Sequence, residues 1–349
     1  MLEKSRNLPA VLRQLTGADD VDTLPPSRRQ QVGWVVVTVY ILRRLVSLVP
    51  ILLGVSLVTF LLVQLVPGDP VQAMLGFEAN QQTVAALRAR YGLDRPVWEQ
   101  YFIWLGNVVQ GDFGRSIQTR RPVLETVLQA LGPTAQLAVA ATLLSLVISI
   151  PAGVASATRK NTPLDVLATF SALSGLSLPS FWLGILLILG FSVAIPIFPS
   201  SGAVAFSEDP WQALRHLALP TVTLGTALAA ATMRMTRSSM LETLSQDFIR
   251  TARAKGLSGP KVIYKHGLRN ALLPVITLLG IQMGQLLGGV VVTETVFAWP
   301  GLGKLTVDAI FARDYPIVQA AVFVMALLFV LINLLTDMFY TFLDPRIKY

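Results

Sequence analysis

The stretch Asp247-Phe-Ile-Arg-Thr-Ala-Arg-Ala-Lys-Gly256-Leu-Ser-Gly-Pro260-Lys-Val-Ile-Tyr-Lys-His-Gly-Leu-Arg-Asn270-Ala-Leu-Leu-Pro274 separates two long apolar segments of the chain. Ser245 is a candidate cap for a short helix that has Asp247 in its first turn, where a carboxylate faces the positive end of the helix dipole. Gly256 is suited to end that helix, and Ser258-Gly259-Pro260 to start a second basic helix, Lys261–Asn270. Two bounded helices are more order than a simple connection requires, so the segment is predicted to be a docking element.

The rest of the composition places this basic segment in a membrane protein. Of the 349 residues, 53% are hydrophobic and only 14% are charged, whereas soluble domains carry about 25% charged residues. The net charge of +8 is attributed to the positive-inside bias of membrane proteins and not to nucleic-acid binding. With no cysteine and only His216 and His266 as histidines, no metal site is predicted.

The apolar pattern predicts an all-α protein with six membrane-spanning helices, because a span needs about 20 apolar residues. The predicted spans are Leu45–Val66, Ala135–Ala155, Val166–Phe191, Leu219–Met235, Leu272–Val292 and Val318–Phe342. The fourth is rich in alanine and threonine between Thr226 and Thr232. Small residues allow close helix packing in lipid, so we expect this helix in the interior of the protein.

The distribution of basic residues orients the spans. Basic residues follow the second and sixth spans, and Arg43-Arg44 precede the first. The stretch from Arg234 to Arg269 holds eight basic residues against Glu242 and Asp247: Arg234, Arg237, Arg250, Arg253, Lys255, Lys261, Lys265 and Arg269. The positive-inside rule then places this stretch and both termini in the cytoplasm.

The same pattern predicts four regions. Residues 1–42 form a cytoplasmic extension with an interfacial segment, and 43–66 form the first span. Residues 67–133 form a large external region of short helices, including 81–90, with an aromatic belt of Trp98, Tyr101, Phe102 and Trp104. Residues 134–349 form the transmembrane core, with a cytoplasmic loop at 236–271.

Two short motifs resemble parts of nucleotide-binding sites, but each lacks the neighbouring residues that such a site requires. Asp112-Phe-Gly114 matches a kinase tripeptide, but no glycine-rich loop or catalytic loop accompanies it. Gly301-Leu-Gly303-Lys304 is followed by Leu305, where a phosphate-binding loop needs Ser or Thr. We therefore predict a protein without a catalytic or nucleotide site of its own.

The predicted spans carry almost no charge in their central parts. Ionisable groups in lipid mark ion pathways and proton relays, but Asp165, Arg234, Glu294 and Asp337 all sit near span ends. An ion-driven carrier is therefore disfavoured. If the protein moves a solute, the energy is expected to come from a partner.

At this point the motifs resemble a known family: the permease subunits of bacterial ATP-binding-cassette (ABC) importers for dipeptides, oligopeptides and nickel. Arg250–Gly256 and His266–Pro274 are similar to the coupling motif of the peptide branch, although the general importer form has Glu where Arg250 stands. Further similarity lies in Arg43–Pro70, in Gln110–Ser116, in Glu294–Gly303 and in Arg313–Pro316. The resemblance extends from about Leu42 to the C-terminus.

The resemblance implies a multi-pass subunit of the bacterial inner membrane with the type I importer permease fold, corresponding to the first (B-type) permease of its system. Its partners would be a homologous second permease, two cytoplasmic ATPases, an external solute-binding protein and membrane lipid. ATP and Mg would be bound by the ATPases, and this chain would bind no cofactor.

The resemblance also implies two sets of site residues. The ATPase-coupling set is Asp247, Arg250, Thr251, Ala252, Arg253, Ala254, Lys255, Gly256, His266 and Arg269. The set near the external gate, where the binding protein would dock, is Glu294, Trp299, Pro300, Gly301 and Gly303. A plain turn made by Pro300 and the glycines is an alternative for the second set.

The sequence leaves the cargo open. Peptides are favoured, with nickel or another small solute carried by the same family as the alternative. A further alternative for the whole protein is a non-transporting membrane scaffold that recruits a cytoplasmic partner through the basic loop. For the loop alone, the simplest alternative is a solvated basic surface without a partner.

Overall fold

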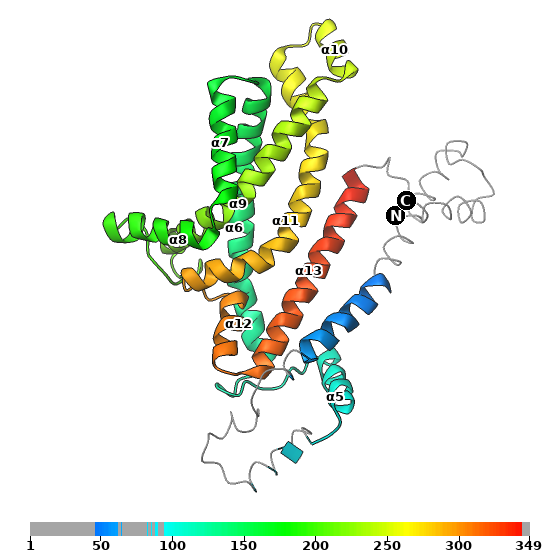
Figure 1. Ribbon diagram of the computed structural model, residues 1–349, viewed down its shortest axis with the longest axis vertical. Coiled ribbons are helices and arrows are strands. Elements are labelled where there is room, and N and C mark those ends of the chain that lie inside the picture. The colour runs from blue at the N-terminus through cyan, green and yellow to red at the C-terminus, as the bar shows by residue number, and fades with distance from the viewer. Residues whose placement is uncertain are drawn as a thin grey trace, which may run out of the picture. The chain divides into compact units, whose positions relative to one another are not determined.

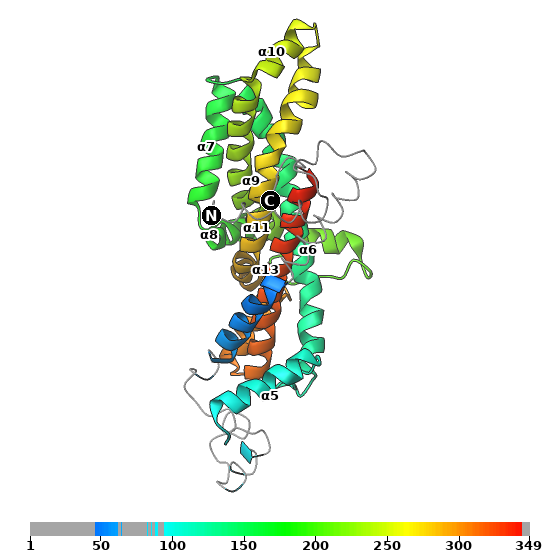
Figure 2. The same ribbon diagram turned by 90° about the vertical axis from the view of Figure 1, so that its right-hand side faces the viewer.

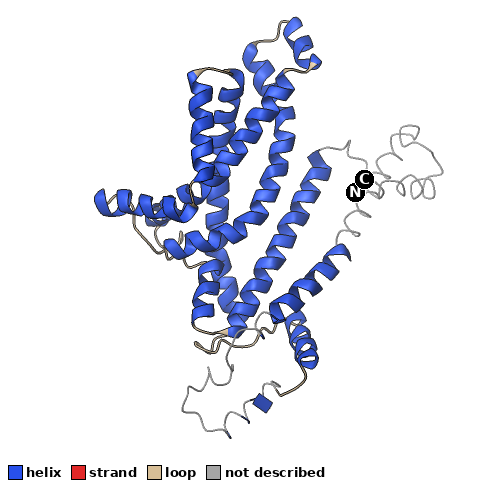
Figure 3. Ribbon diagram, in the orientation of Figure 1, coloured by secondary structure: helices blue, strands red, loops and turns tan. Residues whose placement is uncertain are grey.

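The computed structural model describes residues 46–61 and 94–343, together with positions 64, 82, 85, 88 and 89. The chain divides into two compact units, residues 55–332 and residues 1–54 with 333–349. All regular elements in the described part are helices, and Arg115 and Pro122 form an isolated bridge (Figure 3). The predicted cytoplasmic extension 1–42 lies outside the described residues, as does most of the predicted helix 81–90.

Three described helices are long and apolar enough to cross a membrane, and the number rises to five if each of two bent helix pairs counts as one span. The three are α6 (Val123–Thr158), α9 (Pro210–Leu244) and Tyr315–Thr336 of α13 (Tyr315–Leu343). The apolar helix Val46–Leu61, in the place of the first predicted span, is shorter.

The observed helices extend beyond the predicted spans. Helix α6 begins at Val123 and continues through Pro133, where the sequence reading ended the external region. Helix α9 begins at Pro210, and the Asp209 carboxylate caps it by accepting hydrogen bonds from the Trp211 and Gln212 N–H groups at 2.9 and 3.0 Å. These starts follow local rules, because Asp is a favoured cap and Pro fits the first turn of a helix.

The third predicted span, Val166–Phe191, is not one straight helix. It is divided into α7 (Pro163–Ser177) and the pair α8 (Ser180–Ile188) and η3 (Leu189–Ala194), which meet at an angle of 100°. The break falls at Leu178-Pro179, where Leu178 has an extended conformation. A residue before proline is driven out of the helical region by contact with the proline ring.

The fifth predicted span lies in a continuous helical segment that also contains the second predicted basic helix. Lys261–Leu268 forms the π-helix η4, which passes directly into α11 (Arg269–Val296). The segment bends by 53° between Leu286 and Val290. Figure 1 shows this bend, after which α11 leads towards α12 (Leu302–Phe311).

Helix α9 lies at the centre of the 55–332 unit and packs against α6, α7, α8 and α11 (Figure 1, Figure 2). In the most apolar 18-residue segment of α9, 61% of the segment is buried inside the protein, whereas the corresponding share is 33% in both α6 and α13. The predicted interior position of the fourth span is therefore confirmed. The contact with α6 is close at Gly153, where a Cβ atom would lie 2.7 Å from Cβ of Thr236.

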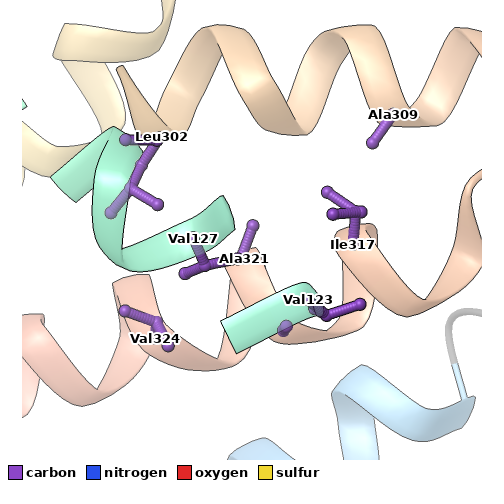
Figure 4. Packing of buried hydrophobic residues seen from close by; sticks show 9 residues of the cluster. Val123, Val127, Leu302, Ala309, Ile317, Ala321 and Val324 are labelled. Atoms are coloured by element: carbon purple, nitrogen blue, oxygen red, sulfur yellow. The ribbon is translucent and has the colours of Figure 1, made fainter. Parts of the chain in front are cut away.

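A second packing centre joins α6, α12 and α13. Figure 4 shows its apolar side chains meeting between these three helices. Its buried members are Val123, Val127, Ala130, Leu302, Ala309, Ile317, Ala320, Ala321 and Val324. The first turns of α6, which belong to the predicted external region 67–133, are thus packed against α12 and α13.

Helix α5 (Val97–Val109) carries the predicted aromatic belt and divides it into two parts. Trp98 and Phe102 are 62% and 64% exposed. Tyr101 and Trp104 instead pack on Phe60, with ring centroids 5.5 and 5.8 Å from its own. Only one face of α5 is therefore available to an interface.

Candidate functional site

The predicted docking helix is α10 (Asp247–Ala254). It lies at one end of the 55–332 unit, while α12 and α5 lie towards the other end (Figure 1). Its C-terminus has the predicted glycine stop: Gly256 has a φ of 75°. The Gly256 N–H donates to the Arg253 carbonyl at 3.0 Å and the Leu257 N–H to the Ala252 carbonyl at 3.4 Å. These two bonds form a Schellman motif, which ends the helix sharply.

The start of α10 differs from the sequence reading. Asp247 is in the first turn, as predicted, but the residue before the helix is Gln246 and no side chain caps it. Ser245 ends α9 instead, and its hydroxyl donates to the Glu242 carbonyl at 2.7 Å. The hydroxyl is thus used by the preceding helix, so Ser245 is not the cap of α10.

One face of α10 is anchored to the chain itself. Ile249 is fully buried and Ala252 is 7% exposed, and both pack with Val262 of η4. The resemblance placed Ala252 in the set of residues that would couple to an ATPase. In the structure its small side chain lies against this chain's own η4, so α10 is held firmly on the membrane unit.

The other face of α10 is open. Phe248 is 45% exposed, and Asp247 and Arg250 form an exposed pair at 3.4 Å. Of the remaining predicted coupling residues, the exposed ones are Thr251, Arg253, Ala254, Lys255, Gly256 and Arg269, while His266 is half-buried. The anchored helix thus presents an apolar ring and several cations to its surroundings.

A buried carboxylate ties together the three helices next to this end. Asp165 of α7 accepts bonds from Nε and Nη2 of Arg237 of α9, at 2.7 and 2.9 Å, and from the hydroxyl of Ser156 of α6. The Asn161 N–H donates to the same carboxylate at 2.9 Å. The sequence reading counted Arg237 among the loop cations, whereas the structure places it in α9 as a partner of Asp165.

The second predicted set of residues forms the corner between α11 and α12, which we call the Glu294 corner: Glu294, Trp299, Pro300, Gly301 and Gly303. Glu294 is fully buried. Its carboxylate accepts a hydrogen bond from the Thr134 hydroxyl of α6 at 2.6 Å and from the Lys304 N–H at 3.0 Å. The residue before α12 is Gly301, which has no side chain to cap the helix. The Glu294 carboxylate of α11 takes this role, because it accepts a hydrogen bond from an N–H group in the first turn of α12.

The glycines of the Glu294 corner allow the start of α12 to lie close to the Glu294 side chain and to the backbone of α11. A Cβ on Gly301 would lie 2.0 Å from Oε1 of Glu294, and one on Gly303 would lie 2.5 Å from Cα of Val291. Trp299 is 1% exposed and its Nε1 donates to the Pro133 carbonyl at 2.9 Å. Pro300 is the exposed member. The corner is thus a packed joint between α6, α11 and α12.

Sequence reasoning missed Thr134, Ser156 and the pairing of Asp165 with Arg237. These partners are far apart along the chain, and serine and threonine are common in membrane helices without a specific role. The available signal was the presence of Asp165 and Glu294 in otherwise apolar helices, since buried carboxylates need partners. In the described part of the chain, no group of three or more His, Cys, Asp or Glu residues is placed to hold a metal ion.

These features define a polytopic helical membrane protein with an anchored, cation-bearing helix projecting from one end. Residues 149–349 match the family described as "Binding-protein-dependent transport system inner membrane component", and residues 37–138 match its N-terminal companion. The chain belongs to this family. It is therefore the membrane permease subunit of a transport system, which works with ATPase and substrate-binding partners and has no nucleotide site of its own.

Curated relatives cover nearly the whole chain. It is 42% identical to the dipeptide transport system permease protein DppB of Alkalihalophilus pseudofirmus and 45% identical to the oligopeptide transport system permease protein AppB of Bacillus subtilis. It is 44% identical to the glutathione transport system permease protein GsiC of Escherichia coli. Each alignment covers 89% of this chain and 99% of the relative. The predicted resemblance to the first permease of peptide-type systems is confirmed.

Solved structures support the fold. Two inward-facing structures of the MetNI methionine ABC transporter align with TM-scores of 0.53 and 0.50, at 19% and 20% sequence identity. Each covers 63% of this chain, and 96% and 97% of the matched chain. The helical core is thus that of an ABC importer permease, as predicted.

Proposed function

We propose that this chain and a homologous second permease form the path by which an ABC importer moves di- or oligopeptides across the bacterial cytoplasmic membrane. The observation that carries this proposal is the 42–45% identity over 89% of the chain to permeases of dipeptide, oligopeptide and glutathione systems. Two cytoplasmic ATPases would bind ATP and Mg and supply the energy. An external binding protein would deliver the peptide.

The proposed topology has six membrane helices and both termini in the cytoplasm. The helix Val46–Leu61 would be part of the first span, and the bent pairs α7 with α8–η3 and η4–α11 would be the third and fifth. Residues 67–133 would form the external region, with the start of α6 packed into the core, and 236–271 the cytoplasmic loop. The basic residues of that loop support this orientation.

Helix α10 would be the coupling helix that enters a groove on an ATPase subunit. Its anchored face, formed by Ile249 and Ala252, supports force transmission, because a displacement of α10 is passed to η4 through buried contacts. Its open face would meet the ATPase through Phe248, Arg253 and Lys255. The continuity of η4 with α11 gives the movement a rigid path into the membrane unit.

The Glu294 corner would form part of the external gate. Its buried side chains support a role as a rigid joint, and the exposed Pro300 is the member that could meet the binding protein. This assignment differs from a plain surface turn, because Glu294 and Trp299 are almost fully buried.

Uptake by the reconstituted complex tests the function. The chain would be purified with its second permease and both ATPases, placed in proteoliposomes, and supplied with the binding protein and a radiolabelled dipeptide. We expect ATP-dependent uptake that an ionophore leaves unchanged. Uptake of a nickel chelate without peptide uptake would favour the alternative cargo. ATP hydrolysis without uptake of either solute would favour a scaffold.

A further inference from the structure

A cavity of about 600 Å³ lies between α6, α7 and α9, towards the end of the unit that carries α10. Its lining includes Ile148 and Ala155 of α6, Leu164, Leu167 and Ala168 of α7, and Thr226 of α9. No charged side chain lines it, and the Thr226 hydroxyl is used by the Val222 carbonyl at 2.6 Å. Ser171 and Thr226 are the polar side chains among the lining residues, and the remaining ones are apolar, so the lining favours an apolar occupant over a peptide backbone.

The rim of this cavity is apolar and open. Of the lining residues, Leu167 of α7 is 66% exposed and Ile148 of α6 is 50% exposed, and the neighbouring Phe170 and Val147 are 67% and 71% exposed. Contact of so many large apolar side chains with water would be unfavourable. In a membrane subunit such a rim faces either lipid hydrocarbon or another membrane subunit, and the test below distinguishes the two.

Two cations stand at one end of the cavity. Arg159 follows Ala155 by one helical turn on α6, and Lys160 is the next residue; both are exposed. On the α7 side, Leu164 lines the cavity just after this turn. The nearby Asp165 and Arg237 pair with each other, so Arg159 and Lys160 leave a net positive charge at this end.

We propose that the cavity is a binding site for an anionic phospholipid. One acyl chain lies among the small residues between α6, α7 and α9, and the phosphate lies beside Arg159 and Lys160. From Ala155 to Ile148 the cavity extends about 10 Å along α6, enough for part of an acyl chain. Basic positions beside pockets between membrane helices are a recurrent feature of anionic lipid recognition.

The lipid occupies a position with structural consequences. It fills the space that the three helices leave between two close contacts of α9: with Gly153 of α6, and with Gly175 of α7, whose Cβ would lie 3.4 Å from Cβ of Ala230. Bound lipid therefore braces α6 and α7 against α9, the helix that leads to α10. This inference is independent of the cargo and of the role of α10.

The test uses the purified complex of all four membrane and ATPase subunits. Native mass spectrometry would measure retention of dioleoyl-phosphatidylglycerol against dioleoyl-phosphatidylcholine. We expect saturable retention of phosphatidylglycerol and roughly tenfold weaker binding when Arg159→Gln and Lys160→Gln are combined. Arg121→Gln, a charge removal at an exposed position outside the site, serves as the matched control and should bind as wild type.

A second pair of variants examines the cavity itself. Ala168→Phe fills it and should abolish retention, whereas Leu173→Phe, at a 47% exposed position of the same helix outside the cavity lining, should leave it unchanged. Equal retention of the two lipids, or wild-type retention in Ala168→Phe, would overturn the proposal. Because the chain has no cysteine, Ala168→Cys introduces a single thiol that reports what occupies the cavity. Efficient cross-linking of that cysteine to the second permease would identify a protein contact there and overturn the lipid site.

Discussion

The Ser116 hydroxyl donates a hydrogen bond to the carboxylate of Asp314, 198 residues further along the chain. The Ile117 N–H donates to the same carboxylate at 3.1 Å, and Asp314 is only 3% exposed. Ser116 belongs to the loop before α6, and Asp314 directly precedes α13. Two motifs that sequence reading treated separately, Gln110–Ser116 and Arg313–Pro316, thus form one buried polar connection.

Asp314→Ala is expected to destabilise the protein by about 2–4 kcal/mol, because it leaves the buried Ser116 hydroxyl and Ile117 N–H without an acceptor. The measurement is the midpoint of thermal unfolding of the detergent-solubilised complex. Asp308→Ala is the control: Asp308 is 60% exposed in its pair with Lys304, and loss of a surface pair costs about 0–1 kcal/mol. Equal effects of the two substitutions would show that the buried connection adds nothing.

The helices themselves were largely predictable from apolar pattern and length. The exception at Leu178-Pro179 shows the limit of that pattern. Pro133, Pro151, Pro220 and Pro274 all lie inside helices, so a proline alone does not predict a break. Whether a helix kinks or ends at a proline depends on whether neighbouring helices satisfy the released backbone groups, and this is a tertiary property.

Gly301→Ala is expected to disrupt the Glu294 corner. The new Cβ would lie 2.0 Å from Oε1 of Glu294, so either the carboxylate leaves Thr134 or α12 shifts. Because uptake is proposed to depend on this joint, we expect peptide uptake to fall at least about tenfold, together with a lower thermal midpoint, as for other overpacked sites. Both are measured on the reconstituted complex.

Gly132→Ala is the matched control for this substitution. Gly132 lies in α6 close to the same corner, but its Cβ would meet nothing within 4 Å. Alanine in a helix interior is favoured over glycine by about 0.5–1 kcal/mol. The control should therefore keep wild-type uptake with equal or higher stability. If Gly301→Ala behaved like this control, the proposed joint would be wrong.

Gly256→Val is expected to uncouple ATP hydrolysis from transport. Gly256 has a φ of 75°, which a β-branched residue adopts only under strain, so the Schellman motif would open and α10 would lose its fixed end. Peptide uptake should fall at least about tenfold, while membrane insertion stays normal. The measurements are uptake and binding-protein-stimulated ATP hydrolysis by the same proteoliposomes.

Gly259→Ala is the control for this position, since its Cβ would meet nothing and it lies outside the left-handed region. It should retain coupled activity. Normal stimulated ATP hydrolysis with normal uptake in Gly256→Val would contradict the proposed coupling role.

Arg253→Glu examines the open face of α10 by reversing the charge of one exposed residue. Stimulated ATP hydrolysis should fall, and more strongly at low ionic strength, because salt screens interactions between exposed charges. Arg121→Glu, at an exposed position far along the chain from α10, is the control and should keep wild-type stimulation. An equal loss in both variants would point to a general charge effect.

The two candidate sites differ in how much of them could be predicted. The end of α10 follows from neighbouring residues, so Gly256 could be assigned from the sequence alone. The environment of Glu294 could not, because Thr134 lies 160 residues away. A carboxylate near the end of an apolar stretch is compatible with both a surface and a buried position. Only the two nearby glycines, Gly301 and Gly303, indicated that the backbone at the start of α12 lies close to α11.

The bond between Asp165 and Arg237 allows the most specific stability test. Asp165→Ala leaves the guanidinium of Arg237 among α6, α7 and α9 without its carboxylate, and loss of one partner of a buried pair costs about 3–5 kcal/mol. Arg237 retains 27% exposure of its side chain, so water will compensate part of this loss and the lower end is expected. The measurement is again the thermal midpoint of the complex.

The double variant Asp165→Leu with Arg237→Met separates the pair from the packing around it. If the penalty comes from the unpaired charge, the apolar pair should be more stable than Asp165→Ala alone, since replacing a buried ion pair with apolar residues is often neutral or stabilising. A double variant that loses the sum of both single effects would instead assign the penalty to packing. Because the pair joins α7 to α9, the helix that leads into α10, the apolar replacement should preserve stability and coupled uptake if its role is only to hold these helices together.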